Sequence, residues 1–500
     1  MVKIIPIDVA KHDAIIAKLP KPKLIIGAEM RDAGEAGVFI HRSNSTGRPL
    51  GEVPMGGARD IDDAVKAARA AFPAWRDMKP YDRKLIMERH CALIEAEMER
   101  FNQIAAIENG IPYSNFKYGH AERVRGWMRY YAGWADKIEG QVVGTNPSGH
   151  FEYTIAEPYG VVGHVITWNA PLLSLSMKIP ACLAAGNTVV IKPAEFTPYT
   201  AQLFTELALE AGYPPGVINV VPGAVAAGEA LVRHRDVDKI SFTGGPTGAR
   251  AIMRDAAETL KPLVFELGGK SANVIFSDVD LAECAPYCTM FGVSNSGQGC
   301  ALPTRMIIHE RIYDAFLDIA ASTMREMSVG DPLNPATIIG PMVHETACAR
   351  VAGVIDAARR ERVGRFLVDG GRLDGALSQG CFIAPVLIAD IDPMSPIAQT
   401  EVFGPALAAM KFTTEDEAVK LANNTAYGLS AYVQTHSLDI AHRMVRKLSA
   451  GTVYVNKATP SFHAAAPFGG NGISGFGREG GKAGLDEFIR IKGVGVSVQA

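Results

Sequence analysis

Apolar and polar residues follow two different periods along this chain. From residue 60 to residue 140, apolar residues recur three and four positions apart, which is the spacing of one face of an α-helix. This spacing predicts amphipathic helices over 60–75, 83–110 and 120–140. The first 55 residues have no such period and predict irregular chain with short strands.

Short β-rich runs alternate with helical stretches between residues 151 and 267. The predicted strands are 160–168, 188–193, 217–221, 239–245 and 263–267, and the predicted helices between them are 172–185, 198–211, 226–234 and 247–257. Strands separated by helices of this length are typical of a doubly wound parallel sheet. Such sheets bind nucleotides at the carboxyl ends of their strands.

The alternation resumes after Gly268 with a strand at 271–276, a helix from Leu281 and another strand–helix pair over 304–327. This pattern predicts a second α/β domain that continues to 468–470. The tail from Ile489 to Val498 alternates apolar and polar residues and predicts a strand. A terminal strand needs a sheet to join. The predicted fold class is therefore α/β, with a doubly wound domain, a second α/β domain and a small β element.

Composition and charge bear on the number of domains, on charged partners and on membrane or signal segments. The chain has 500 residues, which is more than one hydrophobic core usually serves, and 48% of them are hydrophobic. Its 50 basic and 53 acidic side chains nearly cancel, so neither a nucleic acid nor another highly charged partner is expected. No apolar run has the length of a signal peptide core or of a membrane span.

Cysteine and histidine usage bears on compartment and metal binding. The seven cysteines form no C-x-x-C pair, which favours free thiols in a reducing compartment, and we expect a cytoplasmic protein. The twelve histidines are scattered without ligand spacing, so no metal site is expected.

Two residues are candidates for catalysis. Cys300 lies in NSGQGCALPTR, in a loop where Gly297 and Gly299 permit close approach to a ligand. The alternative is a buried, inert thiol. Glu266 ends the apolar strand LVFEL, where loss of solvent should raise its pKa toward that of a useful base. The alternative is a structural salt bridge with Lys270.

Polar residues also follow the predicted strands. Asn169 comes after the strand 160–168 and has an amide that can donate to an oxyanion, although asparagine at such a place is often a turn former. Lys192 and Glu195 follow the next strand and suit a ribose or phosphate, or form a solvated pair. In FTGGPTG (242–248) a strand passes through glycines into a helix start, which suits phosphate.

Two G-x-G-x-x-G matches, GNGISG (470–475) and GFGREG (475–480), are rejected as dinucleotide fingerprints. Neither follows a convincing strand or opens a βαβ unit, and the motif has meaning only in that context.

Together these segments resemble the aldehyde dehydrogenase superfamily over essentially the whole chain. The matching stretches are ITWNAPL (166–172), IKPAE (191–195), FTGGPTG (242–248), FELGGK (265–270), GQGCALPTR (297–305), EVFGP (401–405), APFGGNGISGFGREGG (466–481) and LDEFIRIKGV (485–494). Eight motifs in order are far more specific than any one of them.

The resemblance implies roles for the candidate residues. Cys300 is similar to the nucleophile that forms a thiohemiacetal and then a thioester, and Glu266 to the base that activates water to hydrolyse it. Asn169 and the backbone N–H of Cys300 resemble the oxyanion hole. Lys178 and Glu479 match positions tied to proton movement.

The resemblance also implies an NAD site without the usual glycine fingerprint. Its predicted residues are Ile166, Trp168, Lys192, Glu195, Gly244, Gly245, Leu267, Gly268, Glu401 and Phe403. Among them, Lys192 and Glu195 would bind the adenosine ribose. The Glu195 carboxylate accepts from two ribose hydroxyls but repels a 2′-phosphate, so NAD is favoured over NADP. The positive charge of Lys192 offsets part of this repulsion, so use of NADP stays open.

The family pattern further implies domains and assembly. We expect an NAD-binding domain over 1–138 and 159–267, a catalytic domain over 268–467, and an oligomerisation element over 139–158 and 485–500. The last strand is expected to join a sheet in a neighbouring subunit, giving a homodimer or homotetramer.

The substrate is the least determined feature. The open positions Ala170 and Ser294, with an apolar lining from Met177, Met290 and Phe462, predict a medium or large apolar or aromatic aldehyde. Arg123 and Arg125 in the preceding helix keep an anionic semialdehyde open as a second substrate class. A CoA-acylating or phosphorylating relative and an inactive protein on the same scaffold also stay open.

Overall fold

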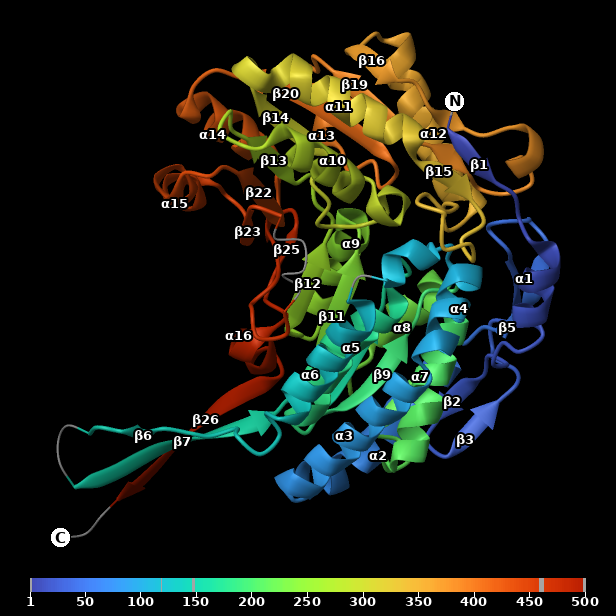
Figure 1. Cartoon of the computed structure of the whole chain (residues 1–500). Coiled ribbons are helices and arrows are strands. Elements are labelled where there is room, and N and C mark those ends of the chain that lie inside the picture. The colour runs from blue at the N-terminus through green and yellow to red at the C-terminus, as the bar shows by residue number, and fades with distance from the viewer. Residues whose placement is uncertain (1, 118, 146–148, 458–462, 498–500) are drawn as a thin grey trace.

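The computed structural model describes residues 2–117, 119–145, 149–457 and 463–497. It has two α/β lobes and a sheet arm that projects from one of them (Figure 1). One lobe is built on an eight-stranded sheet, the other on a seven-stranded sheet, and the arm is a three-stranded sheet. The predicted α/β class is confirmed.

The eight-stranded sheet contains all five strands predicted between 151 and 267. Its strands, in spatial order, are β25 (Gly475–Phe476), β12 (Leu263–Leu267), β11 (Lys239–Gly244), β8 (Val161–Val165), β9 (Thr188–Lys192), β10 (Ile218–Val220), β2 (Leu24–Ile26) and β3 (Glu29–Arg31). The five central strands are parallel, whereas β25 and β2 are antiparallel to their neighbours. The carboxyl ends of the five therefore meet at one edge.

Helices cover both faces of this sheet, because consecutive residues of its strands point to opposite sides. Val161 and Val190 pack in one buried cluster, and Val162 and Val189 in the other. The first face is covered by α2 (Ala58–Asp77), α8 (Val225–Arg233) and α9 (Pro246–Ala257). The second face is covered by α3 (Pro80–Ala96), α4 (Met98–Glu108), α5 (His120–Ala132), α6 (Pro171–Ala184) and α7 (Pro198–Ala211).

The seven-stranded sheet is also covered on both sides. Its strands are β16 (Arg365–Val368), β19 (Val386–Ala389), β20 (Ala406–Phe412), β14 (Arg305–His309), β13 (Ala272–Ile275), β22 (Ser430–Gln434) and β23 (Thr452–Val455). Helices α10 (Leu281–Gly292) and α11 (Tyr313–Glu326) pack on one face. The other face carries α12 (Glu345–Arg360), α13 (Pro396–Gln399), α14 (Glu415–Asn423) and α15 (Leu438–Lys447).

Short elements connect these layers. The two-stranded pairs are β1 (Lys3–Ile5) with β15 (Ser328–Gly330), β4 (Val38–Arg42) with β5 (Pro49–Pro54), β17 (Gly371–Arg372) with β18 (Ile383–Ala384), and β21 (Tyr427–Gly428) with β24 (Asn471–Gly472). Single-turn 3₁₀ helices are η1 (Tyr113–Phe116), η2 (Ser294–Gly297), η3 (Glu310–Ile312) and η4 (Gly375–Leu377), and a last short helix is α16 (Gly481–Asp486). The β1–β15 pair joins the start of the chain to the lobe with the seven-stranded sheet.

The arm consists of β26 (Ile489–Ser497), β7 (His150–Pro158) and β6 (Val142–Val143) (Figure 1). The predicted terminal strand is present, with residue 498 outside the described residues. Within the chain, β26 pairs antiparallel with β7 over its whole length. This pairing uses only the backbone groups on one side of β26, and its other side is the edge of the sheet. The expected joining of a neighbouring subunit's sheet at that edge stays a prediction.

The helical predictions need three corrections. The first 55 residues also contain α1 (Val9–Ile16), which Asp8 caps by accepting from the backbone N–H of Lys11. The run 83–110 forms two helices, which meet at Glu97. The third predicted helix ends at Ala132 rather than at residue 140. In the part of the chain that the structure describes, no helix is both long and apolar enough to cross a bilayer.

Candidate active site

Glu266 and Cys300 come together where the two lobes meet. Glu266 is the fourth residue of β12, between Thr243 of β11 and Gly475 of β25. Cys300 lies in the loop that leads from η2 to β14 of the other sheet. The Cys300 thiol interacts with the Glu266 carboxylate, so residues from two sheets form one catalytic candidate.

The electrostatics of this pair follow from its burial. Burial raises the pKa of Glu266 to about 8, and the Glu479 carboxylate raises it further. The Lys178 ammonium and then the Cys300 thiol act in the opposite direction. A carboxyl group with this pKa gives up and takes up protons near neutral pH, which is the property that the apolar strand LVFEL led us to expect.

The same surroundings act on the thiol. Burial raises the pKa of Cys300 well above its ordinary value, and the nearby carboxylates of Glu266 and Glu401 raise it further. A negative thiolate is unfavourable beside these groups. Nucleophilic attack by Cys300 therefore depends on a neighbour that removes its proton or on a nearby positive charge.

Two glycines make the close approach of the lobes possible. A Cβ atom on Gly269 would lie 2.4 Å from the carbonyl oxygen of Cys300, and one on Gly268 would lie 2.2 Å from Oε2 of Glu401. Glu401 Oε1 instead accepts from the backbone N–H of Gly269 at 3.0 Å. Burial raises the pKa of Glu401 to about 7. A larger residue at Gly269 would meet backbone and push the two lobes apart, whereas one at Gly268 would displace the Glu401 carboxylate.

Asn169 lies beside the cysteine loop, between the end of β8 and the start of α6. Its side-chain Nδ2 donates to the backbone carbonyl oxygen of Gln298 at 3.0 Å, and its backbone carbonyl oxygen accepts from Asn295 Nδ2 at 3.0 Å. These bonds fix its amide against the backbone two residues before Cys300. An Nδ2 group has a second hydrogen, which suits an oxyanion formed on a carbonyl attacked by Cys300.

Lys178 and Glu479 form a buried ion pair behind Glu266. They are 2% and 9% exposed, and Lys178 Nζ also lies 3.3 Å from the hydroxyl oxygen of Ser241. Both residues line a small internal cavity that also contains Met177 and Tyr131. Since Glu479 is close enough to raise the pKa of Glu266, the three groups form a continuous polar path.

The residues predicted to bind the dinucleotide follow the carboxyl ends of the parallel strands. Lys192 Nζ donates to the carbonyl oxygen of Gly223 at 2.7 Å. Burial lowers the pKa of Lys192, and the Glu195 carboxylate acts in the opposite direction. The N–H of Ile166 donates to the carbonyl oxygen of Lys192, and the N–H of Leu267 to that of Ser474. The ring of Trp168 lies 5.3 Å from that of Phe403. These contacts place the two ends of the predicted NAD site on one edge of the sheet.

The edge also fits a dinucleotide in shape. Gly245 begins α9 and has nothing within 4 Å of the position of a Cβ atom, so a ligand has space above the helix start. Gly244 precedes it at the end of β11. The Thr243 hydroxyl is shielded from solvent and has no hydrogen-bond partner among the described residues. A helix start with open space and free N–H groups suits a pyrophosphate.

The residues predicted to line the substrate pocket lie in different places. Ala170 lines a pocket beside Asn169. Met177 lines the internal cavity with Lys178. Met290 is 45% exposed on α10, and Ser294 begins η2. Phe462 lies outside the described residues.

Sequence reasoning missed three residues that support the site. The Ser474 hydroxyl donates to the carbonyl oxygen of Gly268 at 2.7 Å and accepts from the N–H of Gly428 at 3.0 Å. Gln298 accepts from the N–H of Val343, and Asn109 donates to the carbonyl oxygen of Trp168. Ser474 lies in the rejected motif GNGISG, which forms β24 and β25 rather than a strand-to-helix turn. No local pattern marks such contacts.

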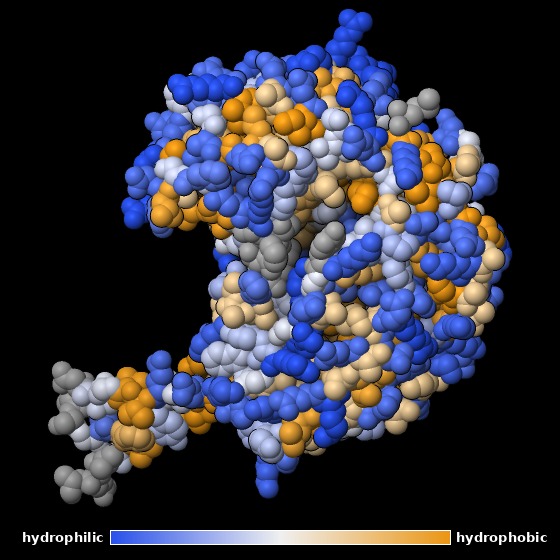
Figure 2. All heavy atoms as spheres, viewed as in Figure 1, coloured by the Kyte–Doolittle hydropathy of each residue, from blue (hydrophilic) through white to orange (hydrophobic). Residues whose placement is uncertain are grey.

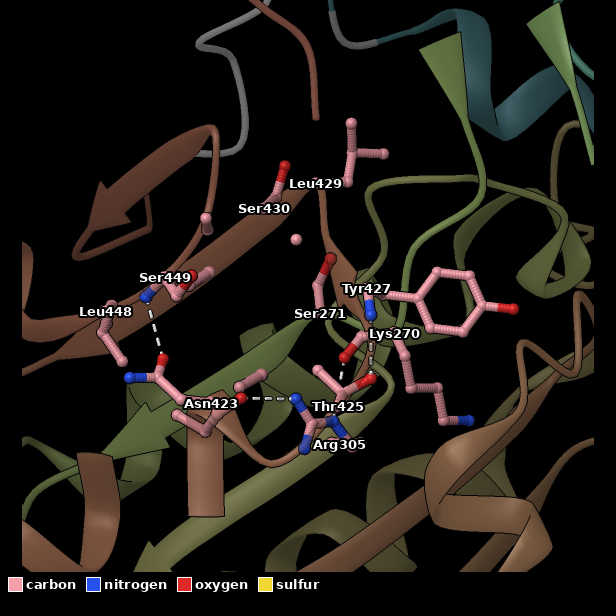
Figure 3. Close-up of a pocket in the computed structure, with 15 residues that line it drawn as sticks. Lys270, Ser271, Arg305, Asn423, Thr425, Tyr427, Leu429, Ser430, Leu448 and Ser449 are labelled. Carbon is pink, nitrogen blue, oxygen red and sulfur yellow. Dashed lines mark hydrogen bonds between the residues drawn. The ribbon is translucent and has the colours of Figure 1, made fainter. Parts of the chain in front are cut away.

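Lys270 does not pair with Glu266, so the structural salt bridge considered for Glu266 is wrong. Burial and then the Arg305 charge lower the pKa of Lys270 to about 7, and its electrostatic partner is Glu401. Lys270 and Arg305 line a small cavity with Ser271 and Tyr427, in which the lysine side chain extends away from the guanidinium (Figure 3). Arg305 donates to the carbonyl oxygen of Lys270 at 2.8 Å. Some of the lining residues follow Glu266 closely in the sequence, but Cys300 is not among them.

The described residues offer no cluster of metal ligands. Among them, no three His, Cys, Asp or Glu side chains are close enough together to bind a metal ion.

Comparisons with known proteins agree with this site. Residues 32–494 match the model of the aldehyde dehydrogenase family. The chain is 40% identical over 477 residues to an aldehyde dehydrogenase of Alternaria alternata, covering 95% of both chains. It is also 40% identical to a mitochondrial aldehyde dehydrogenase of Homo sapiens, covering 95% of this chain and 92% of that one. The chain belongs to the aldehyde dehydrogenase family.

Solved structures give the same result. The NAD⁺ complex of an aldehyde dehydrogenase from Bacillus cereus is 36% identical, with a TM-score of 0.93, covering 99% of this chain and all of that one. The arrangement of lobes and arm is therefore that of a characterised fold.

The negative charge of Glu266 should slow the alkylation of Cys300, because it raises the pKa of the thiol. In Glu266→Gln, removal of the carboxylate should lower the pKa of Cys300 and make iodoacetamide react several-fold faster at about pH 9, where thiolate is the reactive form. Mass spectrometry of the Cys300 peptide measures the rate. Glu258→Gln, on an exposed residue, is the control. An unchanged rate would show that Glu266 does not act on the thiol, and a slower rate would show that it acts as the base for the thiol rather than by charge repulsion.

Proposed function

We propose that this chain oxidises an aldehyde to a carboxylic acid with NAD, using Cys300 as the nucleophile. The observation that carries the proposal is the meeting of three groups from different elements: the Cys300 thiol, the Glu266 carboxylate and the Asn169 amide. A nucleophile, a base and an oxyanion donor in one place are the components of acyl transfer.

The first half of the reaction forms a thioester on the protein. The Cys300 sulfur loses its proton to a neighbouring base and bonds to the aldehyde carbon, whose oxygen becomes an oxyanion held by the Asn169 amide. This adduct is a thiohemiacetal. NAD, held at the strand edge by residues such as Lys192 and Glu195, would supply the hydride acceptor. With loss of hydride from this carbon, its bond to oxygen would become double again and leave a thioester on Cys300.

The second half returns the free enzyme. Glu266 takes a proton from a water molecule, whose oxygen attacks the thioester carbon, and the carbon–sulfur bond breaks to release the acid and the Cys300 thiolate. The proton on Glu266 can then pass toward Glu479 and Lys178, which adjoin it.

The choice of hydrolysis over acyl transfer to CoA rests on Glu266. A CoA-acylating enzyme needs no base for water, whereas here the base touches the nucleophile. The same intact contacts argue against an inactive scaffold, because a buried carboxylate with no function is costly to keep. For the substrate, the pocket beside Asn169 has an apolar lining from Phe101, Ile111 and Leu172, which supports an apolar or aromatic chain next to the aldehyde.

NAD as the cofactor is supported by the fit of the strand edge and by the relative solved with NAD⁺. We assign the lobe with the eight-stranded sheet to NAD binding and the lobe with the seven-stranded sheet to catalysis, as the predicted domain boundaries have them.

The arm supports assembly of identical subunits. The arm strand β26 forms the edge of its sheet, and an exposed edge offers unpaired backbone groups to another strand. Apolar side chains on the arm are exposed, among them Phe151, Ile155, Ile491 and Val496, and apolar atoms gather on it (Figure 2). We propose that these surfaces join copies of the chain as a homodimer or homotetramer.

Loss of the base should separate the two halves of the reaction. Glu266→Gln is expected to give one NADH per Cys300 in a rapid burst and then a steady rate lower by roughly a hundredfold or more. Stopped-flow absorbance at the NADH band measures both phases. Wild-type turnover should rise with pH up to about 8, because the carboxylate form of Glu266 is populated only as pH passes its raised pKa.

Two controls accompany this experiment. Glu258→Gln should behave as wild type, and Cys300→Ser should give no burst. A Glu266→Gln enzyme with normal steady turnover would assign the base to another residue.

Cofactor preference should follow the charge at Glu195. We expect a lower KM for NAD than for NADP, and Glu195→Gln should narrow the ratio by roughly tenfold, because it removes repulsion of the 2′-phosphate. Initial rates with each cofactor measure the ratio, with Glu210→Gln as the control. Equal KM values in the wild type would remove Glu195 from the ribose site.

Light scattering tests the assembly. We expect a mass of two or four chains, and replacement of the exposed Ile491 and Val496 by aspartate should shift it toward one chain. A wild-type monomer would exclude the proposed role of the arm.

A further inference from the structure

The pocket beside Asn169 has two chemically different walls. It spans about 610 Å³ of space between side chains, part of it open to solvent. One wall comes from the start of α6 and from Asn295, next to the cysteine loop. The facing wall comes from α4, η1 and the start of α5. Asn169 and Asn295 both donate to the carbonyl oxygen of Gln298, two residues before Cys300. A molecule bound in this pocket with its aldehyde directed past these two residues would place its remainder against the second wall.

The second wall carries a positive charge. Arg123 and His120 lie three residues apart on α5, so their side chains share one face of the helix, and both line the pocket. Asn115 of η1 lines it beside them. None of the described residues that line the pocket is acidic. Burial lowers the pKa of Arg123, and the adjacent Glu122 carboxylate, which does not line the pocket, acts in the opposite direction. An arginine keeps its proton at neutral pH.

His120 adds hydrogen bonding without adding charge. Burial lowers its pKa to about 4, and the Arg123 charge lowers it further, so the imidazole is neutral. The wall therefore carries one positive charge, a ring N–H and an amide. This set matches a single carboxylate, whereas a phosphate monoester has up to two charges and would be under-compensated.

Of the two arginines that the sequence singled out on α5, Arg123 lies on this wall and Arg125 does not. Arg125 lies two residues further along α5 and donates to Glu95 Oε1 at 2.6 Å, and Arg129 also binds Glu95, at 3.1 Å. Arg125 does not line the pocket. The sequence pointed to both arginines, and the structure places only Arg123 where a substrate passes.

We infer that the substrate is an aldehyde with a carboxylate at its other end, bound through Arg123 with His120 and Asn115, and with an apolar chain between the two groups. The apolar stretch lies against Phe101, Ile111 and Leu172, and so the predicted apolar lining serves the middle of the molecule. This inference rests on the proposed function, because it assumes that the aldehyde is oxidised at Cys300.

Matched acid and ester substrates test it. The probes are 4-carboxybenzaldehyde with its methyl ester, and adipic semialdehyde with its methyl ester, so that each pair differs mainly in charge. In the wild type, kcat/KM for the acid should exceed that for the ester in at least one pair by on the order of tenfold to a hundredfold. In Arg123→Met the ratio should fall to about one, mainly through KM of the acid. Arg125→Met should keep the wild-type ratio and rates.

A binding measurement separates recognition from turnover. Calorimetry with Cys300→Ala, which does not turn over, should show weaker binding of the preferred acid when Arg123→Met is added. Oxidation of the esters with no preference for either acid, or a ratio that Arg123→Met leaves unchanged, would overturn the inference while the proposed function stands. Absence of NADH formation with all four compounds would overturn the proposed function itself.

Discussion

The backbone of Gly269 touches the carbonyl oxygen of Cys300 so closely that only a hydrogen atom fits between them. This contact joins the end of a strand in one sheet to the loop before a strand in the other. It sets the separation of the two lobes, and with it the position of the thiol relative to Glu266. At Gly268 the space of a side chain is occupied by the Glu401 carboxylate, which binds the N–H of Gly269. The lobe boundary thus depends on the missing Cβ atom of Gly269, and the position of Glu401 depends on that of Gly268.

A second consequence of this close packing is the burial of charge. Glu266, Glu479 and Lys178 are all 9% exposed or less, and removing ionised groups from water is unfavourable unless they are paired. Lys178 and Glu479 form an ion pair with each other, whereas Glu266 has no ion-pair partner of its own among the three. The same low-dielectric surroundings that make the cluster costly give Glu266 the pKa of a general base.

The substrate side of the site is built differently. Its residues come from α4, η1, α5 and the start of α6, elements on the outer face of the eight-stranded sheet, and only Asn169 and Asn295 connect it directly to the cysteine loop. Chemistry and recognition therefore lie on separate structural elements. Substitutions on α5 can alter which aldehyde is bound while the thiol, the base and the oxyanion donor keep their contacts.

The sequence alone determined the strand–helix alternation, because the apolar period reports which face each element buries, and its motifs led us to propose Cys300, Glu266 and Asn169 as site residues. It also led us to expect the raised pKa of Glu266, since an acid inside an apolar strand loses solvent wherever the strand lies. Contacts between distant segments were decided only by the tertiary structure. The pairing of β26 with β7, the hydroxyl of Ser474 on Gly268, the partner of Lys270 and the choice between Arg123 and Arg125 all depend on which surfaces meet in space, and no local period or spacing encodes that.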